Sequence, residues 1–240
     1  MQKIAIITGA SKGIGEGIAL AYQQNGYHII SISRTKNENL QHIQQIEFDL
    51  SKTIGIEDLV QKILGEIEKT KVEKITLINN AGTLGKIGRL EDITDIAETV
   101  QLNTTAPLIL TAIFLKLTHN WACEKTIINI SSGAAAKPYS GWTVYCATKA
   151  ALDMMTQTIA LEQEGLINGA KVIAIYPGVV DTDMQAQIRT SDKNSFAAID
   201  RFLDLKANNA LADATTVGQQ IFTAAHDNHI KNGTILRIES

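Results

Sequence analysis

Three glycines between an apolar segment and a helical pattern constrain the fold of this chain more than any other feature. Gly9, Gly13 and Gly15 follow the apolar residues 3–8, and a helical pattern begins at residue 13. In a strand–turn–helix unit, such glycines allow a tight turn, close approach of backbone to a pyrophosphate, and close packing of helix on strand. A glycine triplet alone is also compatible with a plain turn. Its context here favours a dinucleotide site at the helix N-terminus.

Short β-branched runs alternate with longer helical patterns along the rest of the chain. The expected strands cover residues 3–8, 27–33, 46–49, 74–79, 126–131, 171–176 and 234–238. Helices are expected over residues 13–24, 57–69, 93–119, 142–164 and 215–227. This order predicts an α/β chain with a Rossmann fold, a doubly wound sheet of seven parallel strands with helices on both faces.

The length of 240 residues predicts a single domain, 1–240, that binds the nucleotide and carries out the chemistry. Residues 181–214 are the one stretch without a clear period, and their mixture of apolar and polar residues predicts short helices. In a doubly wound fold this stretch would overhang the carboxyl ends of the strands, where ligands bind. We therefore expect a substrate lid there.

Composition argues against several classes of protein. The net charge is −3 with no basic block, so a nucleic-acid partner is not expected. No run reaches the roughly 18 apolar residues of a spanning helix, and the N-terminus does not resemble a signal peptide, so no membrane partner is expected. Cys123 and Cys146 form no CxxC motif, which favours a reducing cytoplasm. His226 and His229 lack further ligands nearby, so no metal site is predicted.

The residues after the second expected strand bear on the type of dinucleotide. An acid about twenty residues beyond the glycines usually accepts the 2′-hydroxyl of NAD, whereas this chain has Ser33-Arg34-Thr35. Arg34 would pair with a 2′-phosphate, and Lys12 in the glycine loop would add a second cation. The alternative is that both are solvated surface charges. NADP(H) is the predicted cofactor.

Two further segments are expected at the nucleotide. Asp49 would accept a hydrogen bond from the adenine amino group, although a helix-capping role is nearly as plausible. Asn80, Ala81 and Gly82 follow the fourth strand, where small residues let the backbone approach the ribose. The alternative for the asparagines is a simple turn.

Tyr145 and Lys149 are four residues apart and share one face of a helix. A phenol with a pKa near 10 is a poor acid or base at neutral pH, and a nearby ammonium would lower that pKa. Lys149 would also hold the nicotinamide ribose. Ser132, expected at the end of the fifth strand, would donate to a substrate oxygen as charge develops. Asn103 lies inside a predicted helix and would anchor a water that links Lys149 to solvent; the alternative is local bonding or surface exposure.

Together these motifs resemble the short-chain dehydrogenase/reductase family over the whole chain. The resemblance rests on residues 8–15, Asn79-Asn80-Ala81-Gly82, Asn103, Ser132, Tyr145 with Lys149, and Tyr176-Pro177-Gly178. It implies a catalytic tetrad of Asn103, Ser132, Tyr145 and Lys149, with Tyr145 as the acid in the reductive direction. It also implies that residues 177–182 hold the nicotinamide. The expected cofactor contacts are Gly9, Ser11, Lys12, Gly13, Ile14, Gly15, Arg34, Thr35, Asp49, Leu50, Asn80, Ala81, Gly82, Tyr145, Lys149, Pro177, Gly178, Val180 and Thr182.

A narrower similarity, in residues 177–185, is to the branch that holds sepiapterin reductases and bacterial benzil reductases. It implies NADPH-dependent reduction of a small ketone or dicarbonyl. The choice of substrate is expected to depend on Tyr139, Trp142 and Val179. Tyr139 and Trp142 are candidates for the pocket walls, with packed surface aromatics as the alternative. Sepiapterin reductases carry a pterin-anchoring aspartate near the C-terminus, where this chain has Glu239 and Ser240. The alternatives are a 3-oxoacyl reductase of the same family and a non-catalytic NADP-binding sensor. The family also implies a homodimer or homotetramer that pairs through the helices expected at 93–119 and 142–164.

Overall fold

The computed structural model describes residues 1–238, and within them seven strands form one parallel sheet. The strand order is β3-β2-β1-β4-β5-β6-β7. The first three strands add toward one edge of the sheet and the last four toward the other, so the switch point lies between β1 and β4. The strands are β1 (Gln2–Thr8), β2 (Tyr27–Ser33), β3 (Gln44–Glu47), β4 (Val72–Asn79), β5 (Glu124–Ile130), β6 (Ala170–Tyr176) and β7 (Ile235–Arg237). The predicted doubly wound fold is confirmed.

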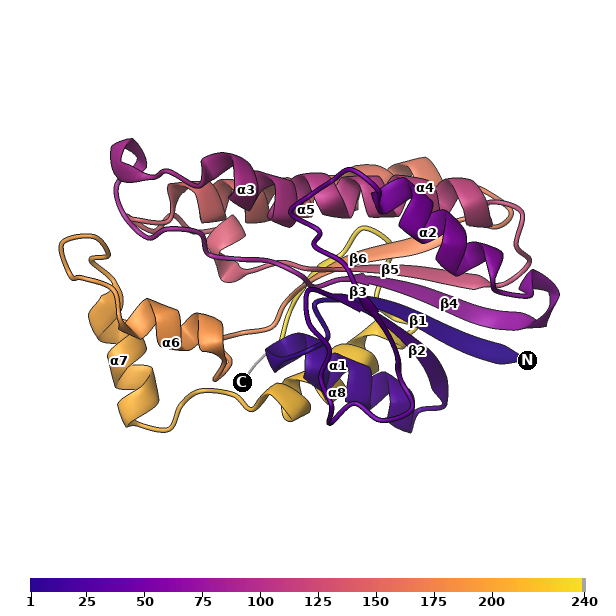
Figure 1. Cartoon of the computed structure of the whole chain (residues 1–240), viewed down its shortest axis with the longest axis horizontal. Coiled ribbons are helices and arrows are strands. Elements are labelled where there is room, and N and C mark those ends of the chain that lie inside the picture. Colours follow the sequence, from indigo (N-terminus) through magenta and orange to yellow (C-terminus); the bar gives the residue numbers. More distant parts are fainter. Residues whose placement is uncertain (239–240) are drawn as a thin grey trace.

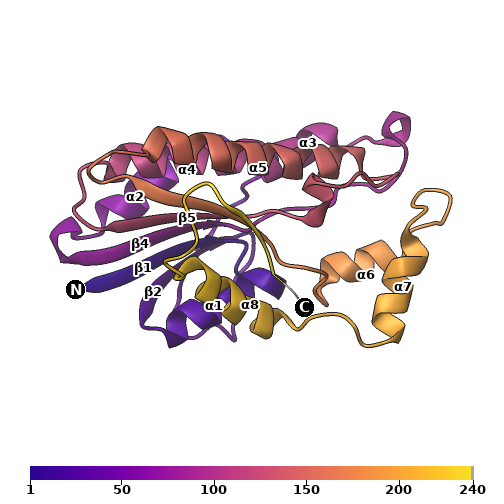
Figure 2. The same ribbon diagram turned by 180° about the vertical axis from the view of Figure 1, so that it is seen from behind.

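Helices cover both faces of the sheet (Figure 1). One layer contains α2 (Ile56–Gly65), α3 (Ile96–Val100), α4 (Ala106–Thr118) and α5 (Thr143–Gln163). The opposite layer contains α1 (Gly13–Gln24) and α8 (Ala214–Ala225), and the view from behind shows the same division (Figure 2). Each face has its own apolar core, because strands that are covered on both sides present apolar residues in both directions.

Backbone contact between α1 and α8 fixes the position of the helix that follows the glycine loop. A Cβ on Gly17 would lie 2.0 Å from the Ala214 carbonyl oxygen, and one on Gly218 would lie 2.2 Å from the Gly17 carbonyl carbon. Only residues without a side chain allow the two helices to come this close. These contacts therefore fix the start of α1 beyond the carboxyl end of the interior strand β1.

Several element boundaries differ from prediction. The helix expected at 93–119 begins at Ile96 and changes to a π-helical segment, Gln101–Thr105, before α4 continues. The strand expected at 46–49 is instead Gln44–Glu47, so Asp49 lies beyond it. Among residues 1–238 this strand pairs only with β2, and its polar residues make it hard to find by a search for apolar runs. Ser132 likewise follows β5 and caps the short turn Gly133–Ala135.

The stretch between β6 and α8 contains two short helices, α6 (Asp183–Arg189) and α7 (Ile199–Ala207). They project beyond the carboxyl ends of the strands, beside the start of α1 (Figure 1). Short helices were expected here. These two helices thus overhang the carboxyl ends of the strands, where ligands bind in such folds, as expected for a lid.

By length and composition, the helical run Ile96–Thr118 could cross a membrane, and 39% of its most apolar window is buried. Core helices of water-exposed proteins meet the same criterion, so this property alone is weak evidence. Ala106, Leu110, Ile113 and Phe114 pack from this run into the core beneath α4. The run therefore supplies one wall of the core.

Candidate active site

The glycine loop is held in shape by contacts from the end of β4. Gly9 has φ +68° and Gly13 has φ +59°, conformations that favour glycine. The Asn80 side-chain amide donates to the carbonyl oxygens of Thr8 and Gly9 at 2.9 and 3.1 Å, while Thr8 Oγ1 accepts from the backbone N–H of Asn80. A Cβ on Gly15 would lie 2.1 Å from the Gly9 oxygen, so the turn and helix meet without intervening side chains. No side chain of these glycines prevents a ligand from approaching the loop backbone.

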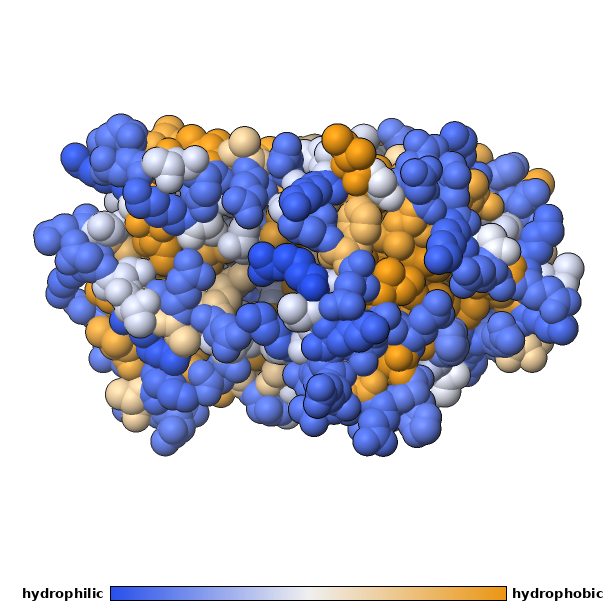
Figure 3. All heavy atoms as spheres, viewed as in Figure 1, coloured by the Kyte–Doolittle hydropathy of each residue, from blue (hydrophilic) through white to orange (hydrophobic). Residues whose placement is uncertain are grey.

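One large cavity runs from the glycine loop to the lid and brings together most of the residues selected from the sequence. Its lining includes every expected cofactor contact together with Ser132. Asn103 is the exception, because its side chain is fully buried behind the cavity wall. The space-filling view shows the molecule hollowed near its middle, with strongly hydrophilic side chains at the edge (Figure 3).

Arg34 and Thr35 follow β2 and lie exposed on the rim of this cavity, close to Asp49. Asp49 Oδ1 accepts hydrogen bonds from the hydroxyl and backbone N–H of Ser51 at 2.7 and 3.1 Å. The hydroxyl bond is the main cause that lowers the pKa of Asp49, with a minor contribution from Arg34. Asp49 therefore closes a turn with Ser51 on the rim of the cavity and does not cap the next helix, because α2 begins at Ile56 with Gly55 as its N-cap.

Lys12 lies within the glycine loop, and its side chain reaches the lid. Its Nζ is 2.7 Å from Asp183 Oδ2 in the first turn of α6, and both side chains are largely exposed. Exposed ion pairs of this kind contribute about 0–1 kcal/mol. Lys12 is thus engaged with the lid, and the pair is weak enough to exchange for another anion.

The side chains of Ser132, Tyr145 and Lys149 meet at the carboxyl ends of β5 and β6. Tyr145 and Lys149 share one face of α5, with Lys149 Nζ 5.7 Å from the Tyr145 ring centroid. Lys149 Nζ donates to the Ile130 carbonyl oxygen at 2.8 Å, at the last residue of β5. Ser132 hydrogen-bonds to Tyr145. The hydroxyl pair and the ammonium therefore face the same part of the cavity.

The pKa of Tyr145 moves opposite to the expectation from sequence. Burial raises it to about 12, and the hydrogen bond with Ser132 only partly offsets this. Burial also lowers the pKa of Lys149 to about 8, against a raising effect from the charge of Asp153. Local spacing correctly placed the ammonium beside the phenol, but it carried no information on how deeply both groups are buried. The phenol is protonated at neutral pH, which is the form of a proton donor.

Asn103 lies in the π-helical segment Gln101–Thr105, a type of irregularity often found at functional sites. Its Oδ1 accepts from Thr83 N at 2.8 Å, and its Nδ2 donates to Thr83 O at 2.8 Å and Thr148 Oγ1 at 3.1 Å. These bonds tie the loop after β4 to the helix that carries Tyr145 and Lys149. The side chain is thus used within the protein, through bonds to residues 20 and 45 positions away and not through the local bonding or surface exposure of the alternative. Anchoring of a water by this residue stays a prediction.

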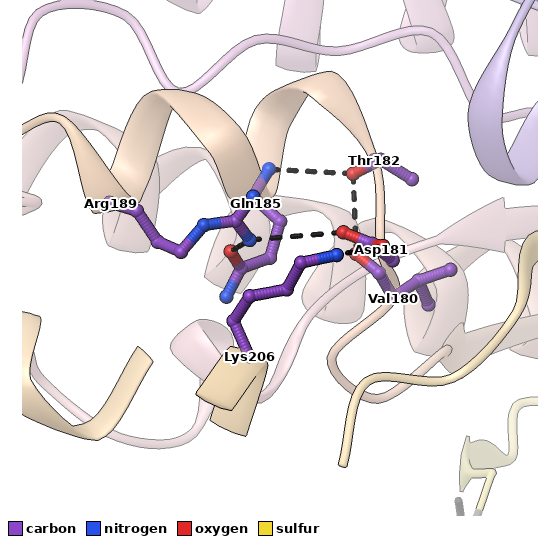
Figure 4. A network of polar contacts seen from close by, with 6 residues as sticks. All are labelled: Val180, Asp181, Thr182, Gln185, Arg189 and Lys206. Atoms are coloured by element: carbon purple, nitrogen blue, oxygen red, sulfur yellow. Dashed lines mark hydrogen bonds and ion pairs between the residues drawn. The ribbon is translucent and has the colours of Figure 1, made fainter. Parts of the chain in front are cut away.

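The segment between β6 and α6 closes one side of the cavity. Thr182 caps α6, and its Cγ2 would lie 3.1 Å from a Cβ on Gly13, so it packs directly on the glycine loop. Asp181 pairs with Lys206 of α7 at 2.6 Å and with Arg189 of α6 at 3.8 Å (Figure 4). The hydrogen bond from Lys206 is the main cause that lowers the pKa of Asp181. One carboxylate therefore joins both lid helices to the end of β6.

Aromatic side chains form the wall opposite the glycine loop. Trp142 is 5.1 Å from Tyr139 and 5.6 Å from Tyr145 between ring centroids, and it stacks on Phe196 at 4.5 Å. Tyr139, Trp142 and Val179 line the cavity as expected. Leu84, Ile188 and Phe202 also line the cavity. They were not predicted as pocket residues, because their sequence patterns are those of ordinary core residues. Cys146 packs against the same apolar cluster.

Comparisons with known proteins identify the family of this chain. The family model of short chain dehydrogenases covers residues 3–193. The chain belongs to the short-chain dehydrogenase/reductase family. It is 37% identical to a benzil reductase ((S)-benzoin forming) of Bacillus cereus, over 99% of this chain and 100% of the relative. It is 28% identical to the sepiapterin reductase of Bos taurus, over 97% and 92%. The crystal structure of the KRED1-Pglu enzyme superimposes with a TM-score of 0.83 at 26% identity, covering 98% of this chain and all of that one.

Membership of this family identifies an oxidoreductase that uses a nicotinamide cofactor, and the similarity to benzil reductases supports a carbonyl reductase. The structure fits such a cofactor, because the side-chain-free turn at Gly9, Gly13 and Gly15 opens onto the cavity and precedes a helix N-terminus. The predicted branch is likewise supported by the two kinds of relative.

Proposed function

We propose that this short-chain dehydrogenase/reductase is an NADPH-dependent carbonyl reductase that acts on a small ketone or dicarbonyl. The observation that carries the proposal is the meeting of Ser132, Tyr145 and Lys149 in the cavity that also holds the glycine loop. A hydroxyl pair and an ammonium beside a nucleotide cradle suit proton transfer to a carbonyl oxygen. A non-catalytic sensor has no need of this arrangement.

The proposed roles follow from charge and burial. The bound reduced nicotinamide supplies the hydride. Tyr145 is protonated at neutral pH because burial raises its pKa to about 12, and it would give its proton to the substrate oxygen. Ser132 would donate to the same oxygen as negative charge develops there. The Lys149 ammonium would hold ribose hydroxyls and stabilise the phenolate that forms, and Asn103 would keep the loop after β4 against α5.

The preference for NADPH rests on Arg34 and Lys12. Arg34 stands on the rim after β2, where a 2′-phosphate would lie if the adenosine follows that strand end. Among the described residues, it forms no ion pair, so its guanidinium is available for a bidentate phosphate contact. Lys12 would contribute once released from Asp183.

The proposed substrate is benzil-like or sepiapterin-like. The aromatic wall of Tyr139, Trp142 and Phe202 suits a flat, largely apolar carbonyl compound. This shape favours an aromatic dicarbonyl over the flexible, carrier-linked chain of a 3-oxoacyl substrate. Glu239, the one candidate for a pterin anchor, lies outside the described residues together with Ser240.

The test follows oxidation of NADPH and NADH, through the absorbance of the reduced nicotinamide, with benzil, a diketone series, sepiapterin and a 3-oxoacyl thioester. We expect benzil or another small dicarbonyl to be reduced, with a rate of NADPH oxidation well above the rate of NADH oxidation. Faster reduction of the thioester would favour the 3-oxoacyl alternative. Tight NADPH binding without turnover of any of these compounds would favour the sensor.

We also propose a cytoplasmic homodimer or homotetramer. On the layer that contains α4 and α5, exposed apolar side chains include Leu108 at 45%, Met154 at 63% and Leu161 at 71%. A second copy would remove this apolar surface from water. Both cysteines are free, as expected in a reducing compartment. Light scattering at several concentrations would measure the assembly, and a concentration-independent monomer mass would contradict it.

A further inference from the structure

A carboxylate lies buried one helical turn beyond Lys149. Asp153 is 9% exposed, and the Tyr176 hydroxyl at the end of β6 donates a short hydrogen bond to its Oδ2. Its other oxygen, Oδ1, is buried without a hydrogen-bond partner among the described residues. Tyr176 is itself 7% exposed, and it lines the cavity together with Lys149.

This arrangement is costly unless another charge compensates it. A buried carboxylate with one hydrogen bond loses most of its hydration, and the same holds for the Lys149 ammonium, which is 5% exposed with one described acceptor, the Ile130 carbonyl. Residues four apart on a helix lie on the same face. Tyr145, Lys149 and Asp153 therefore lie on one side of α5, with Lys149 one helical turn from each of the other two residues.

We propose that Asp153, held in orientation by Tyr176, is a positioning residue that serves as the buried counter-ion of Lys149 and keeps it an ammonium beside Tyr145. The inference rests on the proposed carbonyl reductase function. Its consequence is that the charge of Asp153, rather than its hydrogen bond, maintains the active state at mildly alkaline pH. In agreement, the charge of Asp153 acts to raise the pKa of Lys149, which burial has lowered to about 8.

Other titratable groups around Lys149 do not fill this role in the described part of the chain. Glu98 on α3 is exposed. Lys125 and Lys171 lie near the amino ends of β5 and β6, whereas Lys149 contacts the carboxyl end of β5, and Glu124 is the first residue of β5. Lys125 and Lys171 donate to the carbonyl oxygens of Trp121 and Asp227. The Arg237 guanidinium on β7 lies 5.8 Å from the Tyr176 ring centroid and is a cation, so it cannot serve as the counter-ion of Lys149. On α5 itself, Tyr145 is neutral at neutral pH, because burial raises its pKa to about 12.

The test compares Asp153→Asn with Tyr176→Phe in the full-length protein. The first removes the charge and keeps an acceptor for Tyr176, whereas the second removes the hydrogen bond and keeps the charge. The measurement is the pH profile of kcat/KM for benzil at saturating NADPH. We expect the alkaline limb to move to lower pH by about one unit or more in Asp153→Asn, because loss of an opposite charge lowers the pKa of a buried ammonium. In Tyr176→Phe the limb should move by less than about half a unit.

Superimposed profiles for wild type and Asp153→Asn would overturn the proposal. So would an equal shift in both variants, because a purely structural role of the hydrogen bond would affect both alike. If Asp153→Asn does not fold, as judged by thermal melting, Asp153→Ser provides the same neutralisation with a smaller side chain. If the wild type turns over no carbonyl compound, the proposed function fails. The counter-ion is then tested by the pH dependence of NADPH binding, measured by nicotinamide fluorescence, with the same shift expected.

Discussion

Replacing Gly15 by alanine should damage stability and cofactor binding together. The new Cβ would lie 2.1 Å from the Gly9 carbonyl oxygen and 2.4 Å from Asn80 Nδ2, so backbone must move. Overpacking of this kind costs about 1–3 kcal/mol, and loss of the two Asn80 hydrogen bonds costs about 1 kcal/mol each. The better helix propensity of alanine returns up to about 1 kcal/mol. The free energy of unfolding should therefore fall by about 2–4 kcal/mol.

The assay is thermal unfolding followed by circular dichroism, with NADPH affinity measured by fluorescence. For a chain of this size, such a loss corresponds to a fall in Tm of roughly 5–15 °C. Gly65→Ala is the matched control, since Gly65 ends α2 and a Cβ there would meet nothing within 4 Å. Its Tm should stay the same or rise slightly. A Gly15→Ala protein with wild-type Tm and wild-type NADPH affinity would refute the reasoning.

Three further predictions concern the site. Tyr145→Phe should lower kcat for carbonyl reduction by about 10²-fold or more while NADPH affinity changes little, because only the proton donor is lost; steady-state kinetics with cofactor titration would measure this, and near-normal turnover would contradict it. Arg34→Gln should lower NADPH affinity by about tenfold or more and leave NADH affinity almost unchanged, because only the 2′-phosphate differs; an equal loss for both cofactors would count against a phosphate contact. Asp183→Asn removes the exposed ion pair with Lys12, so Tm should change by no more than a few degrees, given a contribution of about 0–1 kcal/mol. NADPH affinity should rise modestly in that variant at low salt, and titration at two salt concentrations would show whether it does.

Local pattern was enough to predict much of this protein. The order of strands and helices, the glycine turn and the sharing of one helix face by Tyr145 and Lys149 all depend on residues close in sequence. The doubly wound topology follows because parallel strands with helical crossovers have few ways to connect. Boundaries were less accurate where polar residues form structure, as in β3, or where a helix changes its period, as around Asn103.

Properties that depend on long-range contacts and on burial follow only from the folded structure. The direction of the pKa shift of Tyr145 depends on how much water its surroundings exclude, which residue spacing does not encode. Lys12 meets Asp183, and Asp153 meets Tyr176, only because chain segments far apart in sequence converge at the carboxyl ends of the strands. The chemical groups of the site can be identified from the amino-acid sequence alone. Their charges and partners were decided by folding, because electrostatic energies depend on distance and burial in three dimensions.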